Sequence, residues 1–588
     1  MGIFDRIVVH FSSDFKLIVS FMIRKLPFLI ITLLILQCHS SLQVTDYWGS
    51  IQKKAVATKS MVVSGHPLAS RVGIQILKDG GNAVDAAIAI QLALAVVYPR
   101  AGNIGGGGFL IYRSAIGEIN SLDYREKAPA AAYRDMYLDT LGIPTRQSIE
   151  GHLASGIPGT IDGLFTAHKK YGRLPFDLLI APAIKLALEG FQITKDEAER
   201  LNSGRTIFIK YNTINAFIKD EPWKQGDLLV QKDLAWTLSQ IKVKGRDGFY
   251  KGAVAEKIIA EMKQGGGIIT LADLDGYASK WRTPVTAAYK DYRIISMPPP
   301  SSGGIALAQL LKMVEPYPLA TWGFRDPRSI HLMVEAERRV YADRSQYLGD
   351  SDFYNVPKDS LLDPKYIKFR MKDFDSTTAT KSNSLYAGNF KLAIEHFETT
   401  HLSVVDKEGN AVGVTYTLNG NFGSKVVVDG AGFFLNNEMD DFSSKPGVPN
   451  MFGLIGAEAN SIAPGKRMLS SMTPTIVEKN GQLSMVIGSP GGSTIITSVF
   501  QVFLDVAEWN MTMSQAVAAS RFHHQWLPDE IMIESKSFGD DLQIKLKTMG
   551  HTLRDIRSIG LVDAIMKMPD GKLEGGADPR GDDDAEGW

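Results

Sequence analysis

Two β-prone stretches separated by a short turn are the feature that most restricts how this chain can fold. Leu402 to Val405 and Val412 to Thr417 are rich in β-branched residues, and Lys407-Glu408-Gly409 lies between them. A three-residue loop with its glycine in the left-handed conformation is a common hairpin connection. The sequence therefore predicts a β-hairpin that turns at Gly409.

The length of the loop decides which residues of this hairpin face each other. A three-residue loop pairs Asp406 with Asn410, and counting outward places Thr399 directly opposite Thr417. Opposite residues have Cβ atoms about 5 Å apart, so two hydroxyls would meet at the start of the first strand. A two-residue loop would place Thr417 beside Thr400 instead. We predict the first register, although two facing threonines alone are more often an ordinary cross-strand pair.

The composition describes a large globular protein without a strong charge bias. The chain has 588 residues, of which 44% are hydrophobic, enough for a large core. Its 64 basic and 64 acidic residues balance, which argues against nucleic acid as a partner. Cys38 is the single cysteine, and no His-x-x-x-His pattern is present, so we expect neither disulfides nor a metal or other cofactor.

The N-terminal region resembles an export signal. Arg24-Lys25 precede the apolar run from Leu26 to Leu36, which is too short for a spanning helix. We assign residues 1–40 to a signal region, with Met22 as an alternative start because the preceding stretch is long for a signal. The body is then expected to be exported, to the periplasm or to the exterior.

Cys38 leaves two alternatives for the exported form. It directly follows the apolar run, where a bacterial lipoprotein carries its lipidated cysteine, but Gln37 replaces the small residue usual before that position. The exported protein is thus either anchored by a lipid on Cys38 or released from an ordinary signal peptide that includes Cys38.

The remaining chain alternates between helix and strand patterns. Asn82 to Val97 predicts a buried helix capped by Asn82, and Thr494 to Trp509 predicts another long helix. Gly102 to Gly108 follows a helix and precedes a strand, so close backbone packing explains its glycines better than a dinucleotide loop. Residues 160–390 look mostly helical, and Ser382 to Phe397 suits an exposed segment.

Several longer motifs accompany the hairpin in a fixed order. They are Tyr98 to Arg125, Gly151 to Thr160, Met297 to Gly304, Glu398 to His401, Leu435 to Phe442, Leu469 to Thr475, Gly488 to Ser493 and Arg521 to Pro528. This set resembles the γ-glutamyltransferases, which are N-terminal-nucleophile hydrolases. The resemblance covers residues from about 55 to Arg580. It implies an α+β fold, a four-layer αββα sandwich, built from a precursor that cuts itself into a large subunit (41–398) and a small subunit (399–588).

The resemblance assigns the chemistry to the new N-terminus of the small subunit. Cutting the Glu398–Thr399 bond would free the amine of Thr399, and an α-amino group has a pKa of about 8. That amine can act as general base for the Thr399 hydroxyl, which is a weak nucleophile without one. Thr417 would hydrogen-bond Thr399. The implied substrates are glutathione and other γ-glutamyl compounds, with water, amino acids or dipeptides as acceptors.

Further positions match the residues of the family that bind the glutamyl group. Arg125 matches the arginine that binds the α-carboxylate, which a planar guanidinium suits. Ser470 and Ser471 match the serines that support the same carboxylate. Asp441 matches the aspartate that binds the α-ammonium, helped by Glu438 and Asn419.

Two glycines and a loop complete the expected site. Gly491 and Gly492 match the backbone amides of the family's oxyanion hole. Residues 446–467 match the bacterial lid loop, but Phe452 stands where many relatives have a tyrosine. A lid hydrogen bond through that hydroxyl is therefore not expected.

Two other functions compete with a γ-glutamyltransferase. A related acylase of the same fold could act on other amides, such as β-lactam side chains, and would be expected to lose the ammonium-binding Asp441. An uncleaved, inactive binding protein would be expected to lose Thr399 or the glycine pair. All of these residues are present.

Overall fold

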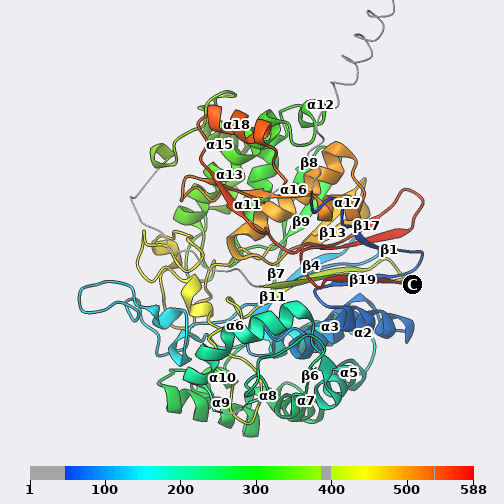
Figure 1. Cartoon of the computed structure of the whole chain (residues 1–588), viewed down its shortest axis with the longest axis vertical. Helices are drawn as coiled ribbons and strands as arrows, with labels where there is room; N and C mark the ends of the chain where they lie inside the picture. Colours follow the sequence, from blue (N-terminus) through cyan, green and yellow to red (C-terminus); the bar gives the residue numbers. More distant parts are fainter. Residues whose placement is uncertain (1–46, 214, 386–398, 535–536) are drawn as a thin grey trace, which may run out of the picture. The chain divides into compact units, whose positions relative to one another are not determined.

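Two antiparallel seven-stranded sheets pack face to face at the centre of the computed structural model (Figure 1). The structure describes residues 47–213, 215–385, 399–534 and 537–588, which belong to one compact unit. The first sheet has the order β1 (Lys53–Ala57), β18 (Leu573–Ala577), β17 (Asp563–Lys567), β13 (Gln482–Gly488), β12 (Thr475–Lys479), β9 (Tyr292–Ser296), β8 (Val285–Tyr289). The second has the order β19 (Asp584–Gly587), β2 (Met61–Ser64), β10 (Thr400–Val405), β11 (Ala411–Thr417), β3 (Gly107–Arg113), β4 (Ile119–Tyr124), β7 (Lys280–Arg282).

Helices cover the outer face of each sheet. The β10 sheet is covered by α2 (Pro67–Lys78), α3 (Ala83–Val97), α4 (Thr160–Tyr171) and, further out, α5 (Phe176–Glu189), α6 (Lys195–Tyr211), α7 (Lys232–Lys244), α8 (Asp247–Tyr250), α9 (Gly252–Gly265) and α10 (Leu271–Asp275). The β13 sheet is covered by α11 (Gly303–Val314), α16 (Ile495–Trp509) and α17 (Met513–Ala518), with α12 (Leu319–Trp322), α13 (Pro327–Tyr347), α14 (Lys358–Leu361), α15 (Pro364–Arg370) and α18 (Asp540–Thr548) around them. The predicted αββα sandwich is confirmed.

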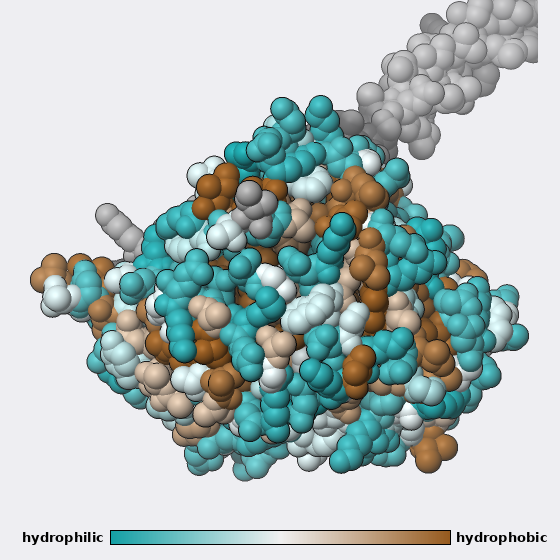
Figure 2. Space-filling model, turned by 90° about the horizontal axis from the view of Figure 1, so that it is seen from below, coloured by the Kyte–Doolittle hydropathy of each residue, from teal (hydrophilic) through white to brown (hydrophobic). Residues whose placement is uncertain are grey.

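Three apolar cores hold the four layers together. The core between the two sheets contains Phe109, Ile295, Val486 and Ile565, all at most 1% exposed. Separate cores lie between each sheet and its helices. The face seen from below in Figure 2 is largely hydrophilic, with small separated apolar areas.

The remaining elements are short. A three-stranded sheet joins β14 (Phe522–His523), β15 (Ile531–Glu534) and β16 (Leu553–Ile556), and a two-stranded one joins β5 (Phe191–Gln192) and β6 (Leu228–Leu229). Single 3-10 turns lie at η1 (Arg146–Ser148), η2 (His152–Ala154), η3 (Ser382–Leu385), η4 (Glu438–Asp441), η5 (Glu458–Asn460) and η6 (Gly492–Thr494).

Helix α3 has the predicted position and environment. The Asn82 side chain accepts hydrogen bonds from the N–H groups of Val84 and Asp85, and the Asp85 carboxylate accepts the N–H of Asn82 in return. Every residue of α3 is buried. Over the described residues, no helix is both long enough and apolar enough to span a bilayer.

The hairpin of β10 and β11 adopts the predicted register. Thr400 pairs with Tyr416, and the N–H of Asp406 donates to the carbonyl of Asn410 at 3.0 Å. Gly409 has a φ of 91° at the turn, as the three-residue loop requires. Thr399 is therefore placed opposite Thr417, which a two-residue loop would not allow.

Residues 160–390 are mostly helical, as predicted, but the strands within them were not predicted and Ser382 differs from its expectation. The segment contains β7, β8 and β9 as well as helices, and β8 and β9 form a hairpin of β-branched and aromatic residues. Ser382 is buried rather than exposed, because its N–H donates to Asp529 and its carbonyl accepts from the indole of Trp526. Residues 386–397, the signal region with Met22 and Cys38, and Glu398 lie outside the described residues.

Candidate active site

The Thr399 hydroxyl lies against the end of β11. Its Oγ1 donates to Oγ1 of Thr417 at 3.4 Å, and the Thr417 oxygen also accepts the N–H of Asn419 at 2.7 Å. Thr399 is 4% exposed. A buried β-branched side chain has few rotamers available. The hairpin therefore holds the hydroxyl in a defined place, next to a second hydroxyl that is itself anchored to the backbone.

Asn419 and the following segment are fixed by side-chain amides. Asn419 has a φ of 77°, which asparagine tolerates better than most residues. Its Nδ2 donates to the carbonyl of Asn437 at 3.0 Å. The glycine-rich segment packs behind them, since a Cβ on Gly106 would lie 2.0 Å from the carbonyl oxygen of Thr417. This agrees with close backbone packing as the role of these glycines.

The end of β13 meets the start of β10 across the space between the sheets. A Cβ on Gly488 would lie 2.1 Å from Cε1 of His401, so the histidine ring fits only against glycine. His401 and Thr399 are two residues apart and point to the same face of the strand. The turn that follows Gly488 contains Gly491 and Gly492, which have φ values of 133° and 53°. Thr399 and the glycine turn thus lie at the same end of two facing strands.

Arg125 forms the centre of a buried cluster of charges. It directly follows β4, and its Nη1 lies 2.6 Å from Oε2 of Glu438 while its Nη2 lies 2.5 Å from Oδ2 of Asp441. Oε2 of Glu126 lies 3.4 Å from Nη1. Burial raises the pKa of all three carboxyl groups, to about 8 for Glu126, although the Arg125 charge opposes the shift. One guanidinium therefore faces three carboxyl groups that compete for it.

The serine pair lies on a neighbouring segment, held by the motif at Met297 to Gly304. The N–H of Ser470 donates to the carbonyl of Pro300 at 2.9 Å, and the Ser302 hydroxyl donates to the carbonyl of Ser470 at 2.7 Å. The Arg125 Nε donates to the carbonyl of Met468 at 3.4 Å, which ties the charge cluster to this segment.

Arg344 on α13 was not identified from the sequence. Its Nη2 donates to the Ser471 hydroxyl and its Nε to the Ser302 hydroxyl, both at 3.0 Å. No carboxylate among the described residues forms an ion pair with this buried guanidinium. Burial lowers the pKa of Arg344, and the nearby Asp441 charge opposes that shift. Arg344 thus places a positive charge behind the predicted carboxylate-binding serines.

The segment matched to the lid loop packs over this cluster. Nδ2 of Asn450 donates to Oδ1 of Asp441 at 3.2 Å, and the N–H of Met451 donates to Asp440 at 2.9 Å. Phe452 is 7% exposed, and its carbonyl accepts from Gln525 Nε2 at 3.2 Å. The loop is therefore held by backbone and amide contacts, without a tyrosine hydroxyl.

Among the residues that the structure describes, one cluster of metal-ligand residues occurs outside the site. His331, Glu335 and His551 are buried, and their ligand atoms lie within 4.8 Å of one another. The two histidines hydrogen-bond each other at 2.8 Å. Glu335 forms ion pairs with Arg338 and Arg339, at 3.2 and 2.6 Å. Two guanidinium charges beside the carboxylate oppose a cation, so we assign this cluster no metal.

The fold and the site define a class of enzyme. Two antiparallel sheets between helical layers, with a threonine at the start of an inner strand, are the arrangement of the N-terminal-nucleophile hydrolases. The family model for gamma-glutamyltranspeptidase matches residues 69–588, and the chain belongs to that family.

Individual relatives agree with this assignment. The chain is 47% identical over 533 residues to the glutathione hydrolase proenzyme of Escherichia coli (strain K12), which covers 90% of this chain and 91% of that protein. The crystal structure of cephalosporin acylase from Bacillus halodurans superposes with a TM-score of 0.80 at 26% identity, over 92% of this chain and 97% of that one. The crystal structure of Helicobacter pylori gamma-glutamyltranspeptidase gives 0.54 at 49% identity, over 55% of this chain and 94% of that one.

Proposed function

We propose that this protein is a γ-glutamyltransferase that cleaves glutathione and related γ-glutamyl amides, and transfers the glutamyl group to water, amino acids or dipeptides. The observation that carries the proposal is the Thr399 hydroxyl, 3.4 Å from Thr417 Oγ1 at the end of an inner strand. The charged groups Arg125 and Asp441, 2.5 Å apart on adjoining elements, supply the recognition that a zwitterionic glutamyl group needs.

Maturation would use the same hydroxyl as catalysis. The Thr399 oxygen attacks the carbonyl carbon of Glu398, the Glu398–Thr399 C–N bond breaks, and water then hydrolyses the resulting ester. The products are a large subunit ending at Glu398 and a small one starting at Thr399. They would stay together as a heterodimer, because β10 and β11 of the small subunit lie between β2 and β3 of the large one.

Turnover would follow the same route with the substrate carbonyl. The free Thr399 amine takes the hydroxyl proton while Oγ1 attacks the γ-carbonyl carbon of the donor. The backbone amides of Gly491 and Gly492 would stabilise the oxyanion, since glycine lets the main chain approach closely. The amide C–N bond breaks, the leaving amine takes the proton, and a γ-glutamyl ester remains on Thr399. Water or an amine then cleaves this ester.

Donor binding would exchange ion pairs within the cluster. The α-carboxylate of the glutamyl group would take the place of a protein carboxylate at Arg125 and receive hydrogen bonds from Ser470 and Ser471. The α-ammonium would then neutralise Asp441, with Glu438 and Asn419 beside it. Arg344 would support the carboxylate through the Ser471 hydroxyl, which it contacts at 3.0 Å. Because each charge keeps a partner throughout, no buried charge is left unpaired.

Replacing Asp441 by asparagine should weaken donor binding but leave self-cleavage largely intact. Asp441 would pair with the substrate ammonium and takes no part in cutting the chain. A hydrogen bond to a charged group contributes about 1.5–3 kcal/mol, so kcat/KM should fall by roughly 10- to 100-fold. Release of p-nitroaniline from γ-glutamyl-p-nitroanilide measures this. Unchanged kinetics would place the ammonium site elsewhere.

Activity should be lost as the pH falls, because two groups must both be deprotonated for the reaction. The Thr399 amine must be neutral to accept a proton, and the Asp441 carboxyl must be ionised to bind ammonium. Burial raises the pKa of Asp441, so it becomes protonated at a higher pH than an exposed aspartate. The kcat/KM of the free enzyme should therefore rise with pH.

The Thr399→Ser variant separates the base from the nucleophile. It keeps the amine but lacks the methyl group that restricts rotation of the hydroxyl. We expect a lower rate with the same acid-side loss of kcat/KM. A pH profile of this variant without an acid-side limb would show that another group is the base.

The acylase alternative is tested with the same protein. The structural likeness to a cephalosporin acylase concerns the fold, whereas the Asp441–Arg125 pair favours a donor with an α-ammonium. Faster hydrolysis of glutarylated cephalosporins than of γ-glutamyl amides would reverse this choice.

We also propose export, from the apolar run at Leu26 to Leu36, and fractionation of cells would test it.

A further inference from the structure

The side chain of Met451 points inward from a tight turn of the segment matched to the lid loop. This turn runs from Pro449 to Ile455, which pair in an isolated antiparallel bridge, and we call it the lid turn. The N–H of Met451 donates to Asp440 at 2.9 Å, and only 7% of the residue is exposed. The backbone thus fixes the position from which the Met451 side chain enters the site.

The sulfur of Met451 accepts hydrogen bonds from two asparagine amides. Its Sδ lies 3.5 Å from Nδ2 of Asn437 and 3.9 Å from Nδ2 of Asn419. Its Cε methyl group packs against Gly420, where an added Cβ would lie 3.1 Å from that methyl group. A thioether is a weak acceptor, so most of the stabilisation comes from this close fit.

These contacts connect the lid turn to the nucleophile and to the proposed ammonium site. The backbone N–H of Asn419 donates to Oγ1 of Thr417, the hydroxyl beside the nucleophile. Asn450, which directly precedes Met451, donates through Nδ2 to Asp441 at 3.2 Å. A displacement of Met451 would therefore disturb both the anchor of the nucleophile and the carboxylate proposed to bind the donor.

We infer that Met451 is a site of oxidative modification, and that its conversion to the sulfoxide lowers the activity of the enzyme. The inference rests on the proposed function. A two-electron oxidant such as hydrogen peroxide transfers one oxygen atom to Sδ. A sulfur lone pair forms the S–O bond, the O–O bond of the peroxide breaks, and water leaves. The sulfur is oxidised and the peroxide is reduced, so no other reactant is needed.

The sulfoxide does not fit the space that the thioether occupies. Protein interiors are close-packed, and an added oxygen between the two amides and Gly420 forces its neighbours to shift. The same amides already have carbonyl partners, at 3.0 Å for Asn419 to Asn437 and at 2.8 Å for Asn437 to Ile149. A sulfoxide oxygen is polar and accepts more strongly than sulfur, so it would compete with these carbonyls. Oxidation should therefore displace the lid turn.

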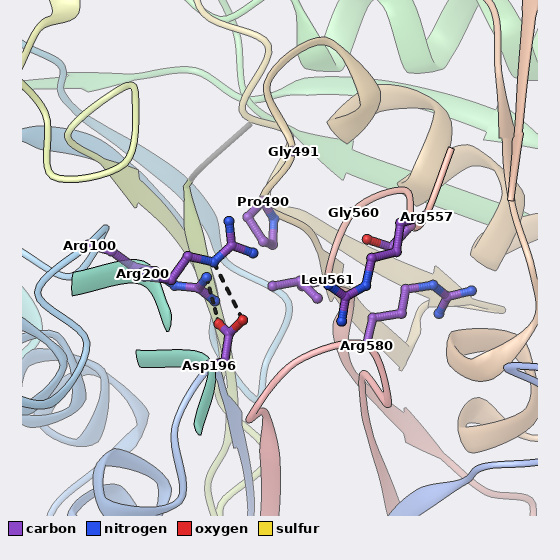
Figure 3. A pocket seen from close by; sticks show the side chains of 10 residues that line it. Arg100, Asp196, Arg200, Pro490, Gly491, Arg557, Gly560, Leu561 and Arg580 are labelled. Atoms are coloured by element: carbon purple, nitrogen blue, oxygen red, sulfur yellow. Dashed lines mark ion pairs between the residues drawn. The ribbon is translucent and has the colours of Figure 1, made fainter. Parts of the chain in front are cut away.

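Met451 is more accessible than three other methionines near the site. Met439, Met468 and Met472 are at most 2% exposed. The cleft of about 720 Å³ beside Gly491 contains no methionine among its described lining residues, and Figure 3 shows mainly arginine side chains there. A small oxidant that reaches the site therefore finds an oxidisable sulfur at the lid turn.

The test treats the purified protein with hydrogen peroxide, and follows release of p-nitroaniline from γ-glutamyl-p-nitroanilide and the mass of the peptide that contains Met451. As this peptide gains one oxygen, kcat/KM of the wild type should fall about tenfold, as expected when Asp441 loses the hydrogen bond from Asn450. Met451→Leu has a similar volume and no sulfur, so it should keep its own untreated rate. Reductases for both sulfoxide epimers should restore the wild type.

Met136→Leu is the matched control. Met136 is also 7% exposed but lies in a separate apolar core, so this variant should be inactivated like the wild type. Hydrogen exchange gives a readout that does not depend on turnover. The amides of the lid turn should exchange faster in the oxidised wild type than in peroxide-treated Met451→Leu.

Two kinds of failure can be told apart. Equal loss of activity in the wild type and Met451→Leu, full activity with Met451 oxidised, or unchanged exchange of the oxidised lid turn would overturn the inference and leave the proposed function. No release of p-nitroaniline by the untreated wild type would overturn both.

Discussion

Replacing Thr399 by alanine should give a single full-length chain without γ-glutamyl hydrolase activity. The variant lacks the hydroxyl that would attack both the Glu398 carbonyl and the substrate, and it never gains the free amine. Loss of a covalent nucleophile lowers kcat by roughly 10³-fold or more. A denaturing gel shows the missing cleavage, and release of p-nitroaniline shows the missing turnover. A Thr399→Ala protein that still splits at the same bond would remove Thr399 from both roles.

Thr400→Ala is the matched control for this result. Thr400 is the adjacent residue of the same hairpin and is also buried, but successive side chains of a strand point to opposite faces. Its hydroxyl therefore lies on the side away from the glycine turn. This variant should still be cut and should still turn over, so any general effect of losing a buried threonine hydroxyl is measured separately.

Replacing Gly491 by alanine should lower kcat by about 10²- to 10³-fold, the usual effect of losing an oxyanion donor. Gly491 has a φ of 133°, which residues with a Cβ rarely adopt, and the added Cβ would lie 2.4 Å from Oγ1 of Thr494. The glycine turn must therefore move, and its amides would leave the position of the oxyanion. Steady-state kinetics with γ-glutamyl-p-nitroanilide measure the effect, and a kcat within twofold of wild type would contradict it.

Gly481→Ala separates backbone strain from catalysis. Gly481 also has a positive φ, of 76°, but lies in the turn between β12 and β13 with no atom within 4 Å of an added Cβ. It should cost stability in thermal unfolding because of its conformation. It should keep kcat, since the turn is at the opposite end of β13 from Gly488.

Turn and capping preferences were sufficient to predict the parts of the fold that are set by residues close together in the sequence. The loop at Lys407 to Gly409 fixed the register of β10 and β11, and with it the meeting of Thr399 and Thr417. The asparagine cap and the small apolar residues defined α3. In both cases the decisive interactions lie within a few residues along the chain, where turn and capping preferences apply directly.

The features that could not be predicted from the sequence depend on contacts between segments that are far apart along the chain. Arg344 is one of several arginines in a polar-looking helix, and nothing near it in sequence shows that it meets Ser471, 127 positions further on. The pairing of Arg125 with Asp441 joins residues 316 positions apart. The resemblance to the family implied opposite roles for these two residues toward a substrate, but it did not indicate their contact with each other. β8 and β9 were missed because a short hairpin lies among long helical segments.

The mass of the small subunit, before and after an acid quench with a γ-glutamyl donor, shows whether Thr399 is both the new N-terminus and the nucleophile. We expect a fragment that begins at Thr399 and gains the mass of one γ-glutamyl group, which peptide mapping should place on Thr399. A fragment with another N-terminus, a glutamyl group on another residue, or an uncleaved chain that turns over the donor would contradict it.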